Sequence, residues 1–173
     1  MVACPLSTHC GQLPDRYDSG MTSAVHSWKQ AGQAYVWRYP PHKKKHQGWH
    51  FTCDNAACDS LTTLIGAMQT EAEPSRRSVV LSPATSDVWA VPNFGEPLRE
   101  HHATMVLEYD PNFGDLLLSE HENRLRLHFG DATASTLINA IRDLKVGRGD
   151  YALPSNDRKA PPIWIWWMLR SKR

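Results

Sequence analysis

Alternating and helix-spaced apolar residues divide the chain into short strands and two helices. Aromatic and β-branched residues predict strands at 33–39, 49–53, 78–82, 87–91, 104–109, 115–119, 124–129, 151–153 and 163–169. Amphipathic helices are predicted at 56–72 and 132–145, where leucine and isoleucine recur with helical spacing. Most strands follow one another along the chain. This order favours an α+β fold, with a largely antiparallel sheet and both helices packed on it.

The strands differ in the number of faces that are apolar. Residues 124–129 alternate leucine or phenylalanine with arginine or histidine, which indicates one packed and one wet face. The last strand is apolar on both faces, with Ile163 and Ile165 on one and Trp164 and Trp166 on the other. Such a strand is either central and covered on both sides, or has one face against another chain.

Residues 48–69 and 125–144 resemble each other. In both, a strand ends in His-Phe, a turn with Asp and Ala follows, and a helix carries the core Thr-Leu-Ile. The candidate N-caps are Asp54 or Asp59 for the first helix and Asp131 or Ser135 for the second. This similarity predicts two β-β-α halves, as an internal duplication would produce. The alternative is that strand–Asp–helix junctions share the same chemistry without common origin.

The length of 173 residues predicts one α+β domain over 31–173. Residues 1–30 lack periodicity and are interpreted as an irregular or mobile N-terminal arm. No basic region followed by an apolar run opens the chain, and no segment approaches the roughly 20 apolar residues of a membrane span. We therefore expect a cytoplasmic protein without membrane contact, whose four cysteines are thiols rather than disulfides.

Charge is balanced over the chain but segregated along it. The net charge of +1 argues against a dedicated nucleic-acid-binding protein. The acidic residues between 96 and 122 are Glu96, Glu100, Glu108, Asp110, Asp115, Glu120 and Glu122, with Arg99 as the one base among them. Bases gather at Arg38 and Lys43–Lys45. Segregated charge can steer a partner, although solvated loops also carry charge of this kind.

Metal binding and catalysis are alternatives with weaker signals. The spacing Cys53-x4-Cys58 does not match a structural zinc motif, and no cofactor is expected. The best candidate metal ligands are His101, His102, His121 and Glu120, from two loops. No Gly-x-Ser-x-Gly or His-Glu-x-x-His motif is present. One catalytic arrangement remains, in which Cys58 at a helix start is paired with His50 or His128 as base.

The favoured hypothesis is a non-enzymatic protein–protein interaction or accessory protein, of a bacterial immunity or defence-associated type. Its candidate docking residues, from the acidic loops and the aromatic strand, are Trp164, Trp166, Glu100, Glu108, Glu120 and Glu122. The expected partner is another protein, with a homodimer through the C-terminal strand as a second arrangement. The alternatives are an enzyme using the loop His and Glu residues, and weak nucleic-acid binding through Lys43, Lys44 and Lys45.

Overall fold

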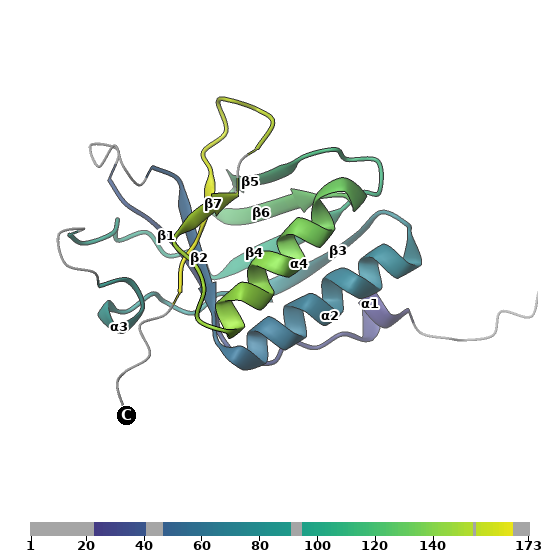
Figure 1. Cartoon of the computed structure of the whole chain (residues 1–173), viewed down its shortest axis with the longest axis horizontal. Helices are drawn as coiled ribbons and strands as arrows, with labels where there is room; N and C mark the ends of the chain where they lie inside the picture. The colour runs from purple at the N-terminus through teal and green to yellow at the C-terminus, as the bar shows by residue number, and fades with distance from the viewer. Residues whose placement is uncertain (1–22, 41–46, 91–94, 154, 168–173) are drawn as a thin grey trace, which may run out of the picture.

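The computed structural model describes residues 23–40, 47–90, 95–153 and 155–167. Its helices are α1 (Ala24–Ser27), α2 (Asn55–Glu71), α3 (Ser86–Trp89) and α4 (Asp131–Lys145). Its strands are β1 (Ala34–Arg38), β2 (Trp49–Cys53), β3 (Ser75–Val80), β4 (Thr104–Tyr109), β5 (Leu116–His121), β6 (Arg124–Phe129), β7 (Tyr151–Leu153) and β8 (Ile163–Ile165). The predicted α+β class is confirmed. The long helices α2 and α4 lie side by side over one face of the sheets (Figure 1).

The strands form two four-stranded sheets. Sheet A has the order β1-β2-β8-β7, and sheet B has the order β3-β4-β6-β5. In each sheet the two outer pairs are antiparallel and the central pair, β2–β8 or β4–β6, is parallel. The sheets are therefore mixed, which corrects the prediction of one largely antiparallel sheet. Each parallel pair joins strands that are not consecutive in the sequence, so the alternation within a strand carries no signal for it.

The order of elements reveals two repeats of type ββαββ. The first repeat is β1-β2-α2-β3-β4, and the second is β5-β6-α4-β7-β8. Sheet A combines the first two strands of the first repeat, β1-β2, with the last two strands of the second, β7-β8. Sheet B combines the last two strands of the first repeat, β3-β4, with the first two strands of the second, β5-β6. The predicted β-β-α halves are thus the first three elements of each repeat. Because every sheet contains strands of both repeats, neither repeat has a complete sheet of its own.

The two helices share five buried positions. Counted from their N-caps at Asp54 and Gly130, the buried residues Cys58, Leu61, Leu64, Ile65 and Met68 of α2 correspond to Ala134, Leu137, Ala140, Ile141 and Leu144 of α4. The alignment of the two Thr-Leu-Ile segments in the sequence therefore differs from the structural alignment of the helices by about one helical turn. It pairs Leu64 with Leu137, whereas the structure pairs Leu61 with Leu137.

Local chemistry explains the helix starts. Asp54 caps α2 as predicted, because its carboxylate accepts from the backbone N–H of Ala57 at 2.8 Å. The caps proposed for α4 were wrong, since Gly130 occupies that position. A side chain does not fit there, because a Cβ on Gly130 would collide with the carbonyl oxygens of Asp110 and Phe113.

The predicted strand at 87–91 is also wrong in its described part, where the chain forms the short helix α3. A short apolar run does not distinguish a strand from a helical turn, and here one turn is enough to bury Val88. Of the predicted N-terminal arm, residues 1–22 lie outside the described part of the chain. The remainder forms α1 and an extended segment, with Val25 buried in the main core.

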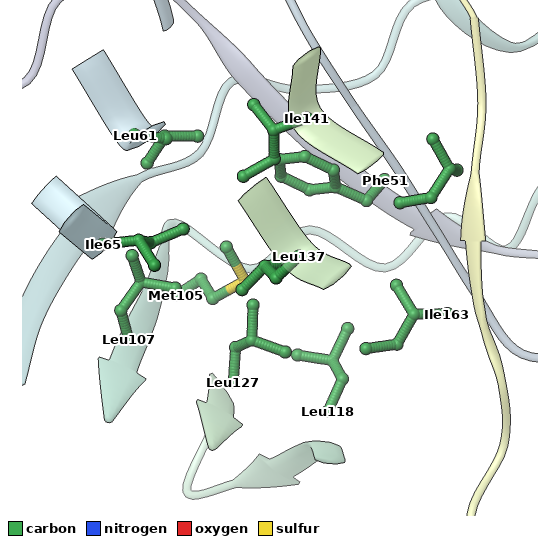
Figure 2. Close-up of a pocket in the computed structure, with 11 residues that line it drawn as sticks. Phe51, Leu61, Ile65, Met105, Leu107, Leu118, Leu127, Leu137, Ile141 and Ile163 are labelled. Atoms are coloured by element: carbon green, nitrogen blue, oxygen red, sulfur yellow. The ribbon is translucent and has the colours of Figure 1, made fainter. Parts of the chain in front are cut away.

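The main core lies between the two long helices and the inner faces of both sheets. Figure 2 shows its centre, where the side chains of α2 and α4 meet those of the strands. The facing residues come in equivalent pairs from the two repeats: Phe51 and Leu127, Leu61 and Leu137, Ile65 and Ile141, Met105 and Ile163, and Leu107 and Ile165. The void between them is about 10 Å³ and entirely apolar, so it is part of the core and not a ligand site.

Two equivalent junctions hold the sheets against each other. The end of β3 meets the start of β1 through a parallel bridge between Ala34 and Leu81. The chain after β7 meets the start of β5 through Asp115, whose carboxylate accepts from the Ser155 hydroxyl at 2.6 Å and the Asn156 backbone N–H at 2.8 Å. Burial alone would raise the pKa of Asp115, but these hydrogen bonds, with one from Leu116 N–H, hold it below its ordinary value.

Truncation of the core tests its central position. Leu61→Ala and Leu137→Ala are each expected to reduce the free energy of unfolding by about 2–5 kcal/mol, because both leave a cavity in a dry interior. Urea unfolding measures this. The control Val80→Thr, at a position 61% exposed, is expected to change stability by about 0.5 kcal/mol or less. Equal effects of the core and control variants would show that the core is misplaced.

The Asp115 junction predicts a pH dependence. Because the folded-state pKa is depressed, the stabilisation is complete above the ordinary carboxyl pKa of about 4 and is lost as the pH falls further. Asp115→Asn is therefore expected to lower stability at pH 7 and to flatten the decline between about pH 5 and pH 2. Unfolding curves of both proteins across this range give the comparison. An unchanged slope in the variant would contradict the assignment.

Candidate functional site

An aromatic cluster lies on the outer face of sheet A, opposite the helices. It consists of Trp37, Tyr39, His50, Trp164 and Trp166, from β1, β2 and β8 with their following residues. The His50 ring is fully buried at its centre, stacked between Trp37 and Trp164 with centroids at 5.5 and 6.0 Å. Tyr39 donates its hydroxyl to the Trp89 carbonyl oxygen at 3.1 Å, and burial raises its pKa. The cluster is a second core.

The connection between β3 and β4 covers this aromatic cluster. Within it, Val88 is buried against Trp37, Tyr39 and Trp166, and Ala84 and Trp89 pack at the margin. The equivalent connection in the second repeat, between β7 and β8, is much shorter. The longer connection therefore acts as a cover for the outer face of sheet A.

The two tryptophans predicted to bind a partner belong to the aromatic cluster. Trp166 is 5% exposed, and Trp164 is half-buried and donates its indole N–H to the Gln47 carbonyl oxygen at 2.9 Å. Their strand β8 is central in sheet A, between β2 and β7. Of the two arrangements considered from the sequence, the structure has the central strand.

An ion cluster joins β1, the β3–β4 connection and β5. Arg38 donates to Glu100 at 2.6 Å, lies 3.3 Å from Glu120, and stacks over the Trp49 ring at 4.7 Å. The hydrogen bond with Glu100 raises the pKa of the Arg38 guanidinium against the opposing effect of burial. The buried His102 lies 3.6 Å from Glu120 through Nε2. Two carboxylates predicted to bind a partner, Glu100 and Glu120, are thus paired with Arg38 within the chain.

The remaining predicted site residues are dispersed. Of the metal candidates, the structure brings His102 and Glu120 together, but the exposed His121 instead lies 3.9 Å from Glu122. Within the described ranges, no three His, Cys, Asp or Glu side chains gather closely enough to hold a metal ion. Residues Lys43–Lys45 lie outside the described part of the chain.

The Cys/His arrangement considered for catalysis is not assembled. Cys58 is buried in the main core below the helices, whereas His50 lies on the opposite face of sheet A. His128 lies on the outer face of sheet B, stacked on Phe113 at 3.6 Å. A strand separates each histidine from the thiol, so neither can accept its proton.

The outer face of sheet B is equivalent to the outer face of sheet A. In contrast to that face, it presents exposed and half-buried side chains. The exposed or half-buried side chains on it are Arg76, Ser78, Val80, Thr104, Val106, Glu108, Leu117, Ser119, His121, Arg124, Arg126 and His128. By position, Arg126 here corresponds to the fully buried His50 of sheet A. The face contains a hollow of about 570 Å³, along which Arg76, Arg124 and Arg126 lie beside Glu108 and Glu122. Among the described residues, an ion pair between Arg126 and Glu108 crosses the centre of the hollow, and it is long at 3.9 Å.

Sequence reasoning identified part of this face. Glu108 and Glu122 were predicted to bind a partner, and both line the hollow. The arginines were missed as site residues, although their outward alternation in 124–129 was recognised. That signal marks a wet face but does not show which other strands lie beside it. Arg76 has no such signal, because only the register of β3 against β4 places it opposite Glu108.

Comparisons with protein-family models, curated proteins and solved structures found no match to this chain. No helix in the described part of the chain is long and apolar enough to cross a membrane. The geometry of the chain is therefore the basis for any functional assignment.

The ion cluster predicts a measurable contribution from Arg38. Arg38→Ala is expected to lower the free energy of unfolding by about 1 kcal/mol, since the side chains are about one-third exposed and solvent screens them. The matched control Arg99→Ala removes a side chain that is 94% exposed and is expected to cost less than about 0.5 kcal/mol. Denaturant unfolding at low and at 1 M salt gives both values. If Arg38→Ala lowers the free energy of unfolding no more than the control does, the ion cluster does not stabilise the fold.

Proposed function

We propose that this protein is a non-enzymatic binding protein that docks another protein on the outer face of sheet B. The observation that carries the proposal is the difference between two equivalent faces. The face on sheet A is covered by the β3–β4 connection, whereas the face on sheet B presents charged side chains around a hollow. A covered sheet face packs against its own chain, and an open one is available to a second chain.

The chemistry of the open face favours a protein partner. Arginines and carboxylates alternate there with half-buried Val106 and Leu117, which gives both charge signs and small apolar areas. Arginine is enriched in protein interfaces, where its fork binds carboxylates and backbone carbonyls. A nucleic-acid surface would instead combine basic residues without interleaved acids. The partner is expected to offer carboxylates to Arg124 and Arg126.

Charge reversal on the open face tests this proposal. The tagged protein is used to capture partners from a nuclease-treated lysate of its own organism, and the bound proteins are identified by mass spectrometry. Arg124→Glu/Arg126→Glu is expected to weaken binding of the captured partner about tenfold or more, since close charge pairs would become repulsive. The titration with purified partner gives the affinity.

The control Arg99→Glu/Arg142→Glu makes the same change of net charge at exposed positions on the β3–β4 connection and on α4. It is expected to bind as the unmodified protein does. Equal weakening by both double variants would indicate a general charge effect and not docking on sheet B. Capture that occurs from an untreated lysate but not from the nuclease-treated one would assign the face to nucleic acid and overturn the proposal.

A further inference from the structure

The sulfur atoms of Cys53 and Cys58 are in direct contact within the main core. Their Sγ atoms lie 3.2 Å apart, and both residues are free thiols. Cys53 ends β2, and Cys58 lies in the first turns of α2, where its backbone N–H donates to the carbonyl of the N-cap Asp54. A disulfide needs an S–S separation of about 2.05 Å, so an approach of about 1 Å would be sufficient for a bond.

The second repeat shows that the fold does not require thiols at these positions. By position, Cys53 corresponds to Phe129 and Cys58 to Ala134, and both of those residues are fully buried. A large and a small apolar side chain thus fill the same place that two thiols fill in the first repeat. The contact between two sulfur atoms is therefore a feature of one repeat, beyond what packing of the shared scaffold needs.

The two thiols are chemically unequal. Their mutual hydrogen bond, together with burial, raises the pKa of Cys53, and the same hydrogen bond lowers the pKa of Cys58. Cys58 also lies near the N-terminus of α2, where the helix dipole favours a thiolate. The residues are 5% and 1% exposed, so only a reactant of about the size of water is compatible with their surroundings.

We propose that Cys53 and Cys58 form a dithiol site that hydrogen peroxide oxidises to an internal disulfide. The Cys58 thiolate attacks one peroxide oxygen, which forms a sulfenic acid and releases hydroxide. The Cys53 thiol then attacks that sulfur, the S–S bond forms, and the hydroxyl leaves as water with the thiol proton. In total, two thiols lose two electrons and two protons, and one hydrogen peroxide becomes two waters. The product links the end of β2 to the start of α2.

The test uses the full chain with Cys4→Ser/Cys10→Ser, so that only the pair can react. Folded protein treated with hydrogen peroxide is expected to lose about 2 Da, with a cross-link between residues 53 and 58 that dithiothreitol reverses. In the same background, Cys53→Ser is expected to stop at a sulfenic acid on Cys58, a gain of about 16 Da. Cys58→Ser is expected to leave Cys53 reduced over the same period.

Peptide mapping of the unmodified protein gives the same answer without any substitution. The proposal is overturned if the folded pair stays reduced at peroxide concentrations that oxidise the urea-unfolded chain. It is overturned also if oxidation gives only sulfinic acid or intermolecular dimers. Equal reactivity of the two single variants would refute the assigned order of attack and, with it, the site as described.

Discussion

The pairing of β2 with β8 and of β4 with β6 is the constraint on which the rest of the structure depends. Each is a parallel pair at the centre of its sheet, and each joins one repeat to the other. If either pair were absent, its sheet would separate into two hairpins, and the inner apolar face of that sheet would lose its continuity. The paired residues are 20 positions apart in β4–β6 and 114 apart in β2–β8, so the chain loses loop-closure entropy, above all in β2–β8, before the core compensates for it. We therefore regard the two repeats as one cooperative folding unit.

This interlocked arrangement also explains how one scaffold carries two different outer faces. The inner residues of the repeats, such as Leu61 and Leu137, are constrained by the same core and remain alike. The outer residues face no shared element, and His50 and its positional equivalent Arg126 differ completely in burial. The longer β3–β4 connection covers one face and leaves the other open. Functional difference is thus expected on the outside of the sheets and not in the core.

The sequence predicted what local chemistry decides and missed what distant contacts decide. The bounds of α2 and α4 were predicted to within one residue, because their apolar stripes and flanking residues are local signals. The parallel central pairs and the helical turn of α3 depend on packing across the chain, and local patterns do not encode it. At the candidate site, the outward alternation of 124–129 was visible. The pairing of Glu100 and Glu120 with Arg38, some 60 to 80 positions away, was not visible.

The comparison of the two repeats separates a packing role of the Cys53–Cys58 contact from a chemical role. In a chain without internal repetition, two buried thiols in contact are adequately explained as small core residues. Here the same scaffold position is filled by Phe129 and Ala134, which pack equally well without reactive groups. The structure therefore contains its own control for packing. What remains different in the first repeat is the sulfur chemistry, placed where a strand end and a helix N-terminus meet and where a bond between them would alter the junction of β2 with α2.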